Sequence, residues 1–294
     1  MNINSLFNLI KSNNILYFLA YPIIYIRRLI LKVQYNLFDK YYNKIFSIVK
    51  EGSLVVDISD FEGLFEMDSR SNFLRLIFKY QSYEKEIVDI VRKHINPTRD
   101  VIDVGANIGL YSILFSKLIF KDHRVLCIEP SPAAIKYLRK NIERNNSVNT
   151  IIYEGIATKT KGYYKFNIIP GMEEYSSLGP ITHRWTDGKK YESIDVSGDT
   201  IDNLVINYNL NPGFIKVDVE GAEYLVFSGA RETIKKYRPI ILSELSDNMM
   251  TNLGNSSEDV IQMLRECNYE IINALNVNIS IRSPFNGNIL AIPS

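Results

Sequence analysis

The 294-residue chain has few of the cysteine and histidine residues that form disulfides and structural zinc sites. It holds 2 cysteines and 3 histidines, and no Cys-x-x-Cys pair occurs. Cys127 stands inside an apolar run, where a cysteine packs as a small hydrophobic residue. The sequence therefore supports neither a disulfide framework nor a structural zinc site, and we expect no metal site. The composition fits a reducing compartment.

Uncompensated charge is equally scarce. The 34 Lys and Arg residues balance 33 Asp and Glu residues, which leaves a formal net charge of +1. A dedicated nucleic-acid binder needs clustered, unbalanced Lys and Arg, so no nucleic-acid partner is expected. Hydrophobic residues make up 46% of the chain, enough for the core of one large α/β domain or two small ones.

The N-terminal part lacks an apolar run long enough to cross a bilayer. Residues 15–26 read ILYFLAYPIIYI, which is interrupted by Pro22 and falls short of the ~20 residues that a spanning helix needs. Arg27 and Arg28 follow the apolar run, whereas in a signal peptide the basic residues precede it. Two interpretations remain open: a helical layer packed on the domain, or a tyrosine-rich segment over residues 15–33 in peripheral contact with a membrane. We expect a cytoplasmic protein, with the second interpretation placing it on the inner face of the membrane.

Three parts follow one another along the chain. Residues 1–50 are expected to be mainly helical, and residues 51–98 to form a β-hairpin over 53–68 and a helical lead-in. Residues 99–294 alternate strand and helix patterns, which favours right-handed βαβ units and a parallel sheet. The strands are expected near 101–104, 124–129, 150–155, 162–169, 214–218 and 239–245, and the helices near 108–118, 132–145, 223–237 and 257–267. The final two strands are expected to form an antiparallel hairpin at the sheet edge.

The stretch VIDVGANIGLYS, residues 101–112, has the form of a nucleotide loop without its middle glycine. Gly105 and Gly109 allow a sharp turn from strand into helix, and the helix N-terminus should then offer free amide groups to a ligand. A pyrophosphate site needs a further glycine near position 107, where Asn107 stands instead. This favours an amino-acid-bearing nucleoside over a dinucleotide; the alternative is a plain tight turn.

The next strand ends in LCIEPS, which places Glu129 where an acidic residue can accept both ribose hydroxyls. Ser131 and Pro132 suit the N-cap and the first position of the following helix. The alternative for Glu129 is a solvated carboxylate at a helix start.

With these motifs in view, residues 80–294 resemble the FkbM-type family of S-adenosylmethionine-dependent methyltransferases. The resemblance rests on YEKE (83–86), VIDVGANIGLYS, CIEPS, SSL (176–178), FIKVDVEGAEYLVFSGA (214–230), PIILSEL (239–245) and the terminal NILAIP. It implies a Rossmann-like class I methyltransferase fold, an α/β fold with a seven-stranded, mostly parallel sheet, helices on both faces and an antiparallel last strand. It also implies O-methylation, commonly of a sugar hydroxyl.

The resemblance further implies a cofactor site for S-adenosyl-L-methionine. Around the methionine part it implies Asp103, Gly105, Ala106, Asn107 and Gly109, with Tyr83 and Glu84 closing over that end. At the ribose and adenine it implies Glu129, Pro130, Ser131, Gly155, Ile156 and Ala157.

The run KVDVEGAE adds acidic residues to the same edge of the sheet. Asp218 ends a strand and Glu220 lies just beyond it, so both should face the cleft of Gly105, where Glu244 can join them. A sugar hydroxyl is a poor nucleophile that gains from a positioned base, so Asp218 and Glu220 are candidate catalytic residues, and Asp218 also lies beside the cofactor. Metal ligation and a structural role are the alternatives for both.

His183 lies in ITHRWTDG, inside a polar stretch over residues 170–190. Histidine suits proton transfer near neutral pH, so His183 is a third catalytic candidate on a substrate lid. A surface loop with one packed tryptophan is the alternative.

These features predict methyl transfer from S-adenosyl-L-methionine to a hydroxyl of a sugar, a glycan or a glycan precursor. An NAD-dependent oxidoreductase and a non-catalytic membrane-associated scaffold of the same fold are the other classes. Asn107 disfavours the first, and the intact loop and acidic cluster disfavour the second.

Overall fold

The structure is a computed structural model that describes residues 52–80, 82–181, 186, 190–276, 281 and 284–294. The predicted helical segment 1–50, its proposed membrane contact over 15–33 and the candidate His183 lie outside these residues. Within the described part, no helix is both long and apolar enough to cross a membrane.

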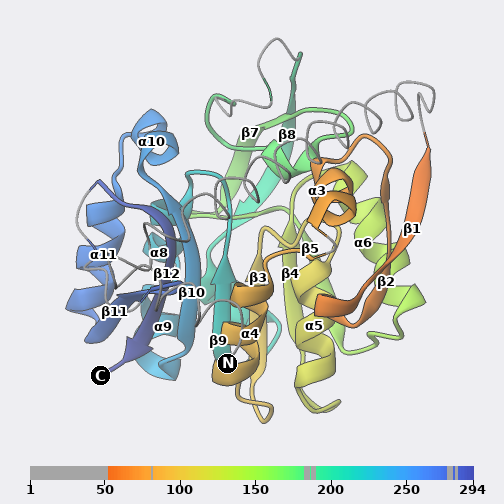
Figure 1. Cartoon of the computed structure of the whole chain (residues 1–294). Coiled ribbons are helices and arrows are strands. Elements are labelled where there is room, and N and C mark those ends of the chain that lie inside the picture. The colour runs from red at the N-terminus through yellow and green to blue at the C-terminus, as the bar shows by residue number, and fades with distance from the viewer. Residues whose placement is uncertain (1–51, 81, 182–185, 187–189, 277–280, 282–283) are drawn as a thin grey trace, which may run out of the picture. The chain divides into compact units, whose positions relative to one another are not determined.

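A seven-stranded sheet forms the centre of the described part (Figure 1). Its strand order is β11-β12-β10-β9-β3-β4-β5. The strands are β3 (Asp100–Val104), β4 (Val125–Glu129), β5 (Thr150–Glu154), β9 (Pro212–Val217), β10 (Ile240–Ser246), β11 (Tyr269–Asn273) and β12 (Asn286–Pro293). The neighbours from β10 to β5 pair in parallel, whereas β12 is antiparallel to both β10 and β11. This confirms the predicted mostly parallel sheet with an antiparallel last strand, and the terminal hairpin at its edge.

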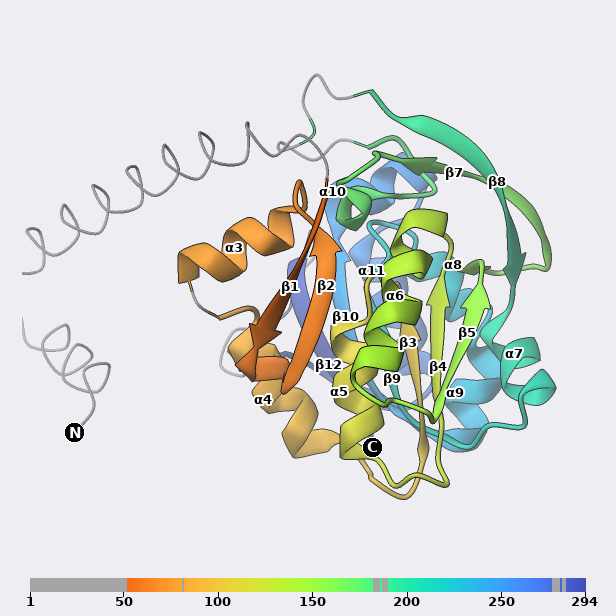
Figure 2. The ribbon, with the colours of Figure 1, turned by 90° about the vertical axis from the view of Figure 1, so that its right-hand side faces the viewer.

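Helices cover both faces of this sheet (Figures 1 and 2). On one face lie α4 (Lys85–His94), α5 (Leu110–Leu118) and α6 (Pro132–Arg144), and on the other lie α7 (Ile201–Asn207), α8 (Glu223–Ser228), α9 (Arg231–Tyr237) and α11 (Ser257–Glu266). Every residue of β3, β4 and β9 is buried, as expected of central strands covered on two sides. Their apolar side chains join those of α7, α8, α9 and α11 in one core.

The hairpin predicted over 53–68 is present as β1 (Ser53–Ile58) and β2 (Gly63–Asp68), with the one-turn helix η1 (Ser59–Phe61) between them. The side chain of Asn141 on α6 holds β2 by accepting from Glu66 N at 2.7 Å and donating to Glu66 O at 3.0 Å. After the hairpin comes α3 (Asn72–Tyr80), and α4 then leads into the sheet. The hairpin therefore packs on the α/β layers.

A second, three-stranded sheet has the order β6-β8-β7. It consists of β6 (Ile156–Ala157), β7 (Gly162–Ile168) and β8 (Glu192–Asp199), and the one-turn helix η2 (Glu173–Tyr175) follows β7. Its strands lie above the carboxyl ends of the central strands in the view of Figure 1. The short helices α10 (Asp247–Met250) and η4 (Thr251–Leu253) follow β10.

The single helix predicted over 223–237 is wrong, because the structure has α8 and α9 separated at Gly229. A Cβ at Gly229 would lie well under 3.0 Å from Thr158 O, and Gly229 O accepts from Asp202 N at 2.9 Å. Residue 229, where α8 ends, must be a glycine because another backbone segment approaches too closely for a side chain.

Candidate active site

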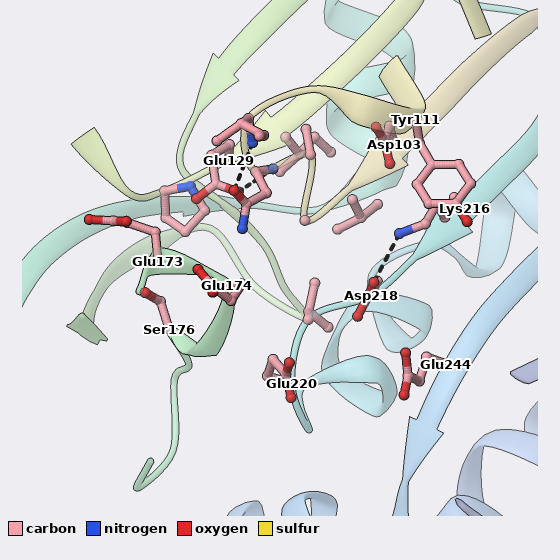
Figure 3. Close-up of a pocket in the computed structure, with 18 of the residues that line it drawn as sticks. Asp103, Tyr111, Glu129, Glu173, Glu174, Ser176, Lys216, Asp218, Glu220 and Glu244 are labelled. Atoms are coloured by element: carbon pink, nitrogen blue, oxygen red, sulfur yellow. Dashed lines mark hydrogen bonds and ion pairs between the residues drawn. The ribbon is translucent and has the colours of Figure 1, made fainter. Parts of the chain in front are cut away.

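A cavity of about 310 Å³ opens at the carboxyl ends of β3, β4, β9 and β10 (Figure 3). This is the edge at which open α/β sheets bind ligands. Its acidic lining residues are Glu84, Asp103, Glu129, Glu173, Glu174, Asp218, Glu220 and Glu244, and Lys216 is the one lysine or arginine among the described lining residues. The described part of the lining is therefore strongly acidic.

The loop between β3 and α5 forms the floor of this cavity. Gly105 has φ +81, and a Cβ there would overlap the backbone oxygen of Asp218, well under 3.0 Å away. Gly105 is therefore required where the loops after β3 and β9 meet. Gly109, with φ +93, caps α5 and packs against Leu138, and it does not line the cavity.

The amide groups of residues 105–109 in this loop are already hydrogen-bonded. Gly105 N and Ala106 N donate to Ile128 O, Asn107 N donates to Glu129, and Gly109 N donates to Ala106 O. Ile108 N donates at 2.7 Å to the side-chain oxygen of Asn107, which has φ +48. Hydrogen bonds within the loop and to β4 therefore hold residues 105–109 in place as the floor of the cavity, and the amide groups of these residues are not available to a ligand.

Glu129 stands at one end of the cavity, at the last position of β4. It is 6% exposed, and its two oxygens accept from Asn107 N and Ser131 N, each at 2.8 Å. Burial raises the pKa of Glu129 to about 7, while these two hydrogen bonds oppose the rise. The alternative of a solvated carboxylate is therefore wrong. Ser131 supports it from outside the lining, as N-cap of α6.

Lys216 and Asp218 form the other end. Lys216 is 6% exposed, with its Nζ 3.1 Å from Asp218 Oδ2 and 4.6 Å from the centre of the Tyr111 ring. Burial opposes the charge of Lys216, but the carboxylates of Asp218, Asp103 and Glu84 together raise its pKa. The Tyr111 hydroxyl donates to Glu84 at 2.7 Å. A buried cation thus sits among carboxylates, as burial of a charge requires.

Asp103, on β3, interacts electrostatically with Lys216 and is fully buried. One of its oxygens accepts from the Ser112 hydroxyl at 2.6 Å, and the other has no hydrogen-bond partner in the described part of the chain. Burial raises the pKa of Asp103. An unpartnered buried oxygen on the lining marks a place where a ligand donor fits.

Two more carboxylates stand near Asp218. Burial and the charge of Asp218 raise the pKa of Glu220 well above its usual range. Glu244 is solvent-exposed, and mainly the charge of Asp218 raises its pKa to about 8. In Figure 3, Glu220 and Glu244 lie on the same side of the cavity as Asp218, with Glu129 at the far end. Within the described residues, no three His, Cys, Asp or Glu side chains are grouped as a metal site.

The structure brings most of the predicted site residues together in this cavity. The predicted lining residues are Tyr83, Glu84, Asp103, Gly105, Ala106, Asn107, Glu129, Pro130, Gly155, Ile156, Ala157, Asp218 and Glu220, with Glu244 beside them. The sequence analysis missed Lys216, Tyr111 and η2. A lysine inside an otherwise apolar strand pattern, FIKVD, was an available signal for Lys216. No local pattern marked η2.

A family model described as the methyltransferase FkbM domain matches residues 103–271. The chain belongs to this family. The match begins at Asp103 and includes the loop, Glu129 and the Lys216–Asp218 pair. The matched region therefore contains most of the residues that line the cavity.

Three similar proteins illustrate the relationship to known methyltransferases. The chain is 26% identical over 204 residues to methyltransferase sdnD of Sordaria araneosa, covering 58% of this chain and 76% of that protein. It is 33% identical over 79 residues to the ribosomal protein L11 methyltransferase of Thermosipho africanus (strain TCF52B), covering 27% and 29%. A solved FkbM methyltransferase from Methylobacillus flagellatus KT is 18% identical, with a TM-score of 0.43 over 67% of this chain and 44% of that one.

The buried carboxyls of the methyltransferase predict a stability that falls as the pH rises. Burial raises the pKa of Glu129 and Glu223 from 4.5 to about 7. The stability that these two carboxyls contribute is fully present below pH 4.5, where they are protonated in both the folded and the unfolded state. It is lost as the pH rises through about 7, where the folded protein also releases their protons. Chemical denaturation should give a lower free energy of unfolding at pH 8 than at pH 5.5, by a few kcal/mol, and Glu223→Gln should reduce the difference. An equal or higher value at pH 8 contradicts this.

Proposed function

We propose that this family member transfers a methyl group from S-adenosyl-L-methionine to a hydroxyl group of a sugar, a glycan or a glycan precursor. One arrangement carries the proposal. A single cavity holds the Glu129 carboxylate at one end and the Asp218 carboxylate at the other, with the Gly105–Asn107 floor between them. The Glu129 carboxylate suits a ribose, and the Asp218 carboxylate suits an acceptor hydroxyl. The acidic lining suits a ligand with a sulfonium and an ammonium group.

The residues present fit this cofactor. Glu129 keeps lone pairs beyond its two backbone hydrogen bonds, and these can accept from ribose hydroxyls. Ile156 and Ala157 offer apolar surface for an adenine. The unpartnered oxygen of Asp103 and the carboxylate of Glu84 lie at the methionine end, where they can hold the ammonium group. When bound, the cofactor supplies an electrophilic methyl group.

The protein's own part in the chemistry is to orient the acceptor and take its proton. The Asp218 side chain is 35% exposed, so a hydroxyl can reach it, and Lys216 holds one of its oxygens. We assign the base to Asp218. Positioning of the acceptor oxygen in line with the methyl group would supply much of the rate acceleration. Glu220 and Glu244 flank this position and can bind the remaining hydroxyls.

Calorimetry with S-adenosylhomocysteine tests the cofactor site. The wild-type chain should bind it and should not bind NAD. Glu129→Gln should weaken binding by roughly ten- to a hundredfold, because a hydrogen bond to a charged group contributes about 1.5–3 kcal/mol. Glu154 is the β5 residue paired in register with Glu129, is exposed and lies outside the cavity, so Glu154→Gln is the matched control and should bind normally. NAD binding without S-adenosylhomocysteine binding by folded protein would refute the proposal.

Asp218→Asn tests the base. The substitution keeps the shape but removes the proton acceptor, so turnover should fall by roughly 10²–10⁴-fold. Affinity for S-adenosylhomocysteine should change much less. Single-turnover transfer of a labelled methyl group measures the first quantity and calorimetry the second. Unchanged turnover would remove Asp218 from the mechanism.

A further inference from the structure

We infer that the acceptor binds between α3 and the turn formed by residues 173–176, and that this subsite takes an uncharged, polyhydroxylated ring and rejects rings bearing phosphate or carboxylate. The inference deepens the proposed function and rests on it, because the cofactor must extend from Glu129 to Asp103 and Glu84 and leave the space beyond its methyl group to the acceptor. The space left for an acceptor is then the part of the cavity near Asp218, Glu220 and Glu244.

Apolar and aromatic side chains wall this part of the cavity. Phe73 and Leu76 line it from α3, and Tyr83 lines it from the segment before α4. The rings of Phe73 and Tyr83 pack edge to face, with centroids 5.1 Å apart and planes at 74°. Tyr175 lines it from the turn. Such surfaces accept the C–H faces of a sugar ring while polar groups between them bind its hydroxyls.

The turn is hydrogen-bonded to α3, and these bonds hold this wall of the cavity in place. The backbone N–H of Asn72, at the start of α3, donates to Glu174 at 2.6 Å, and the Asn72 side chain donates to the Tyr175 hydroxyl at 2.8 Å. Tyr175 is 8% exposed. Two segments distant in sequence thereby hold one opening at a set width, which suits recognition of a particular ring.

The charges around this opening set the chemical class of the acceptor. Glu173 and Glu174 lie on the turn, and Glu220 and Glu244 lie across the cavity from it (Figure 3). The lysine of the lining, Lys216, is already paired with Asp218. Outside the lining, Arg70 is bound to Asp68 and Arg75 acts electrostatically on Tyr175. Burial raises the pKa of Glu173 and Glu220 and raises that of Glu174 to about 7, so these carboxyls can bind ring hydroxyls in either protonation state. Each one that ionises repels a phosphate or carboxylate, and the described lining offers an anion no unpaired cation in return.

Matched acceptors test the inference on the full chain. The probes are methyl hexosides and 6-deoxyhexosides, each compared with its 6-phosphate or uronate counterpart where one exists. Transfer of label from S-adenosyl-L-methionine and saturation-transfer NMR with the S-adenosylhomocysteine complex are measured, with and without Mg²⁺. At pH 9, where Glu244 with its pKa of about 8 is ionised, we expect at least tenfold higher kcat/KM for neutral members, and Glu244→Gln should narrow that difference. Preference for an anionic member, or no binding or transfer with any neutral member, overturns the inference.

A pair of variants on α3 locates the subsite. Phe73→Ala should raise the acceptor KM by about tenfold and leave S-adenosylhomocysteine affinity within twofold. Phe78→Ala is the control on the same helix, because Phe78 is 46% exposed and does not line the cavity. Equal acceptor KM values for the two variants place the acceptor elsewhere. If the wild-type chain does not bind S-adenosylhomocysteine, the proposed function itself is refuted. That outcome is distinct from a failure of the acceptor subsite alone.

Discussion

Gly105→Ala is expected to abolish cofactor binding and to destabilise the protein by about 4 kcal/mol or more, a cost typical of substitutions that force a buried backbone apart. The added methyl group would overlap the backbone oxygen of Asp218. Neither partner can rotate away, because Gly105 N donates to Ile128 O and Asp218 N donates to Val104 O, both at 3.0 Å. The loops after β3 and β9 would have to separate.

Gly254→Ala is the control for this prediction. Gly254 has φ +74, close to that of Gly105, but a Cβ there would meet nothing within 4 Å. It should cost only the backbone strain of a left-handed alanine, about 1–2 kcal/mol. Guanidinium denaturation and calorimetry with S-adenosylhomocysteine compare the two variants. Equal losses of stability would mean that backbone strain, and not the close approach to Asp218, makes glycine necessary at position 105.

Lys216→Met is expected to cost about 2–4 kcal/mol of stability, somewhat less than removal of one partner of a fully buried ion pair, because the Asp218 side chain is 35% exposed and water screens its charge. The substitution leaves the carboxylate of Asp218 without its partner and Asp103 without a compensating cation. Adding Asp218→Asn should recover part of the loss, with a coupling of about 0.5–3 kcal/mol. Chemical denaturation of the single and double variants measures this coupling.

An exposed ion pair serves as the comparison. Lys165 Nζ lies 2.9 Å from Asp195, and the two side chains are 70% and 64% exposed. Lys165→Met should therefore change the free energy of unfolding by less than about 1 kcal/mol. If Lys216→Met is as mild as Lys165→Met, the Lys216 ammonium does not compensate the buried carboxylates.

Sequence motifs predicted the residues at the strand ends well, for a physical reason. The βα units are local, so a strand pattern followed by a helix pattern fixes where each loop begins. Parallel strands bring their carboxyl ends to one edge, and Gly105, Glu129 and Asp218 therefore had to converge. The structure places all three on one cavity.

Contacts between distant segments escaped prediction. The side-chain oxygen of Asn107 accepts from Ile108 N within the loop, a contact that the loop motif did not reveal. Gly229, at which the predicted helix is interrupted, lies against the backbone of Thr158, far away in the chain. The polar stretch 170–190 was predicted to form a substrate lid, but its sequence did not indicate that Glu174 and Tyr175 would be held by Asn72 of α3.

The sequence by itself determined the family, the order of the strand and helix patterns and the acidic edge, since each follows from local patterns and short motifs. Only the tertiary structure decided that Lys216 sits buried against Asp218 and Tyr111, and that α3 and the 173–176 turn wall one side of the cavity. These depend on side-chain packing and on which distant segments meet, and no local spacing encodes either.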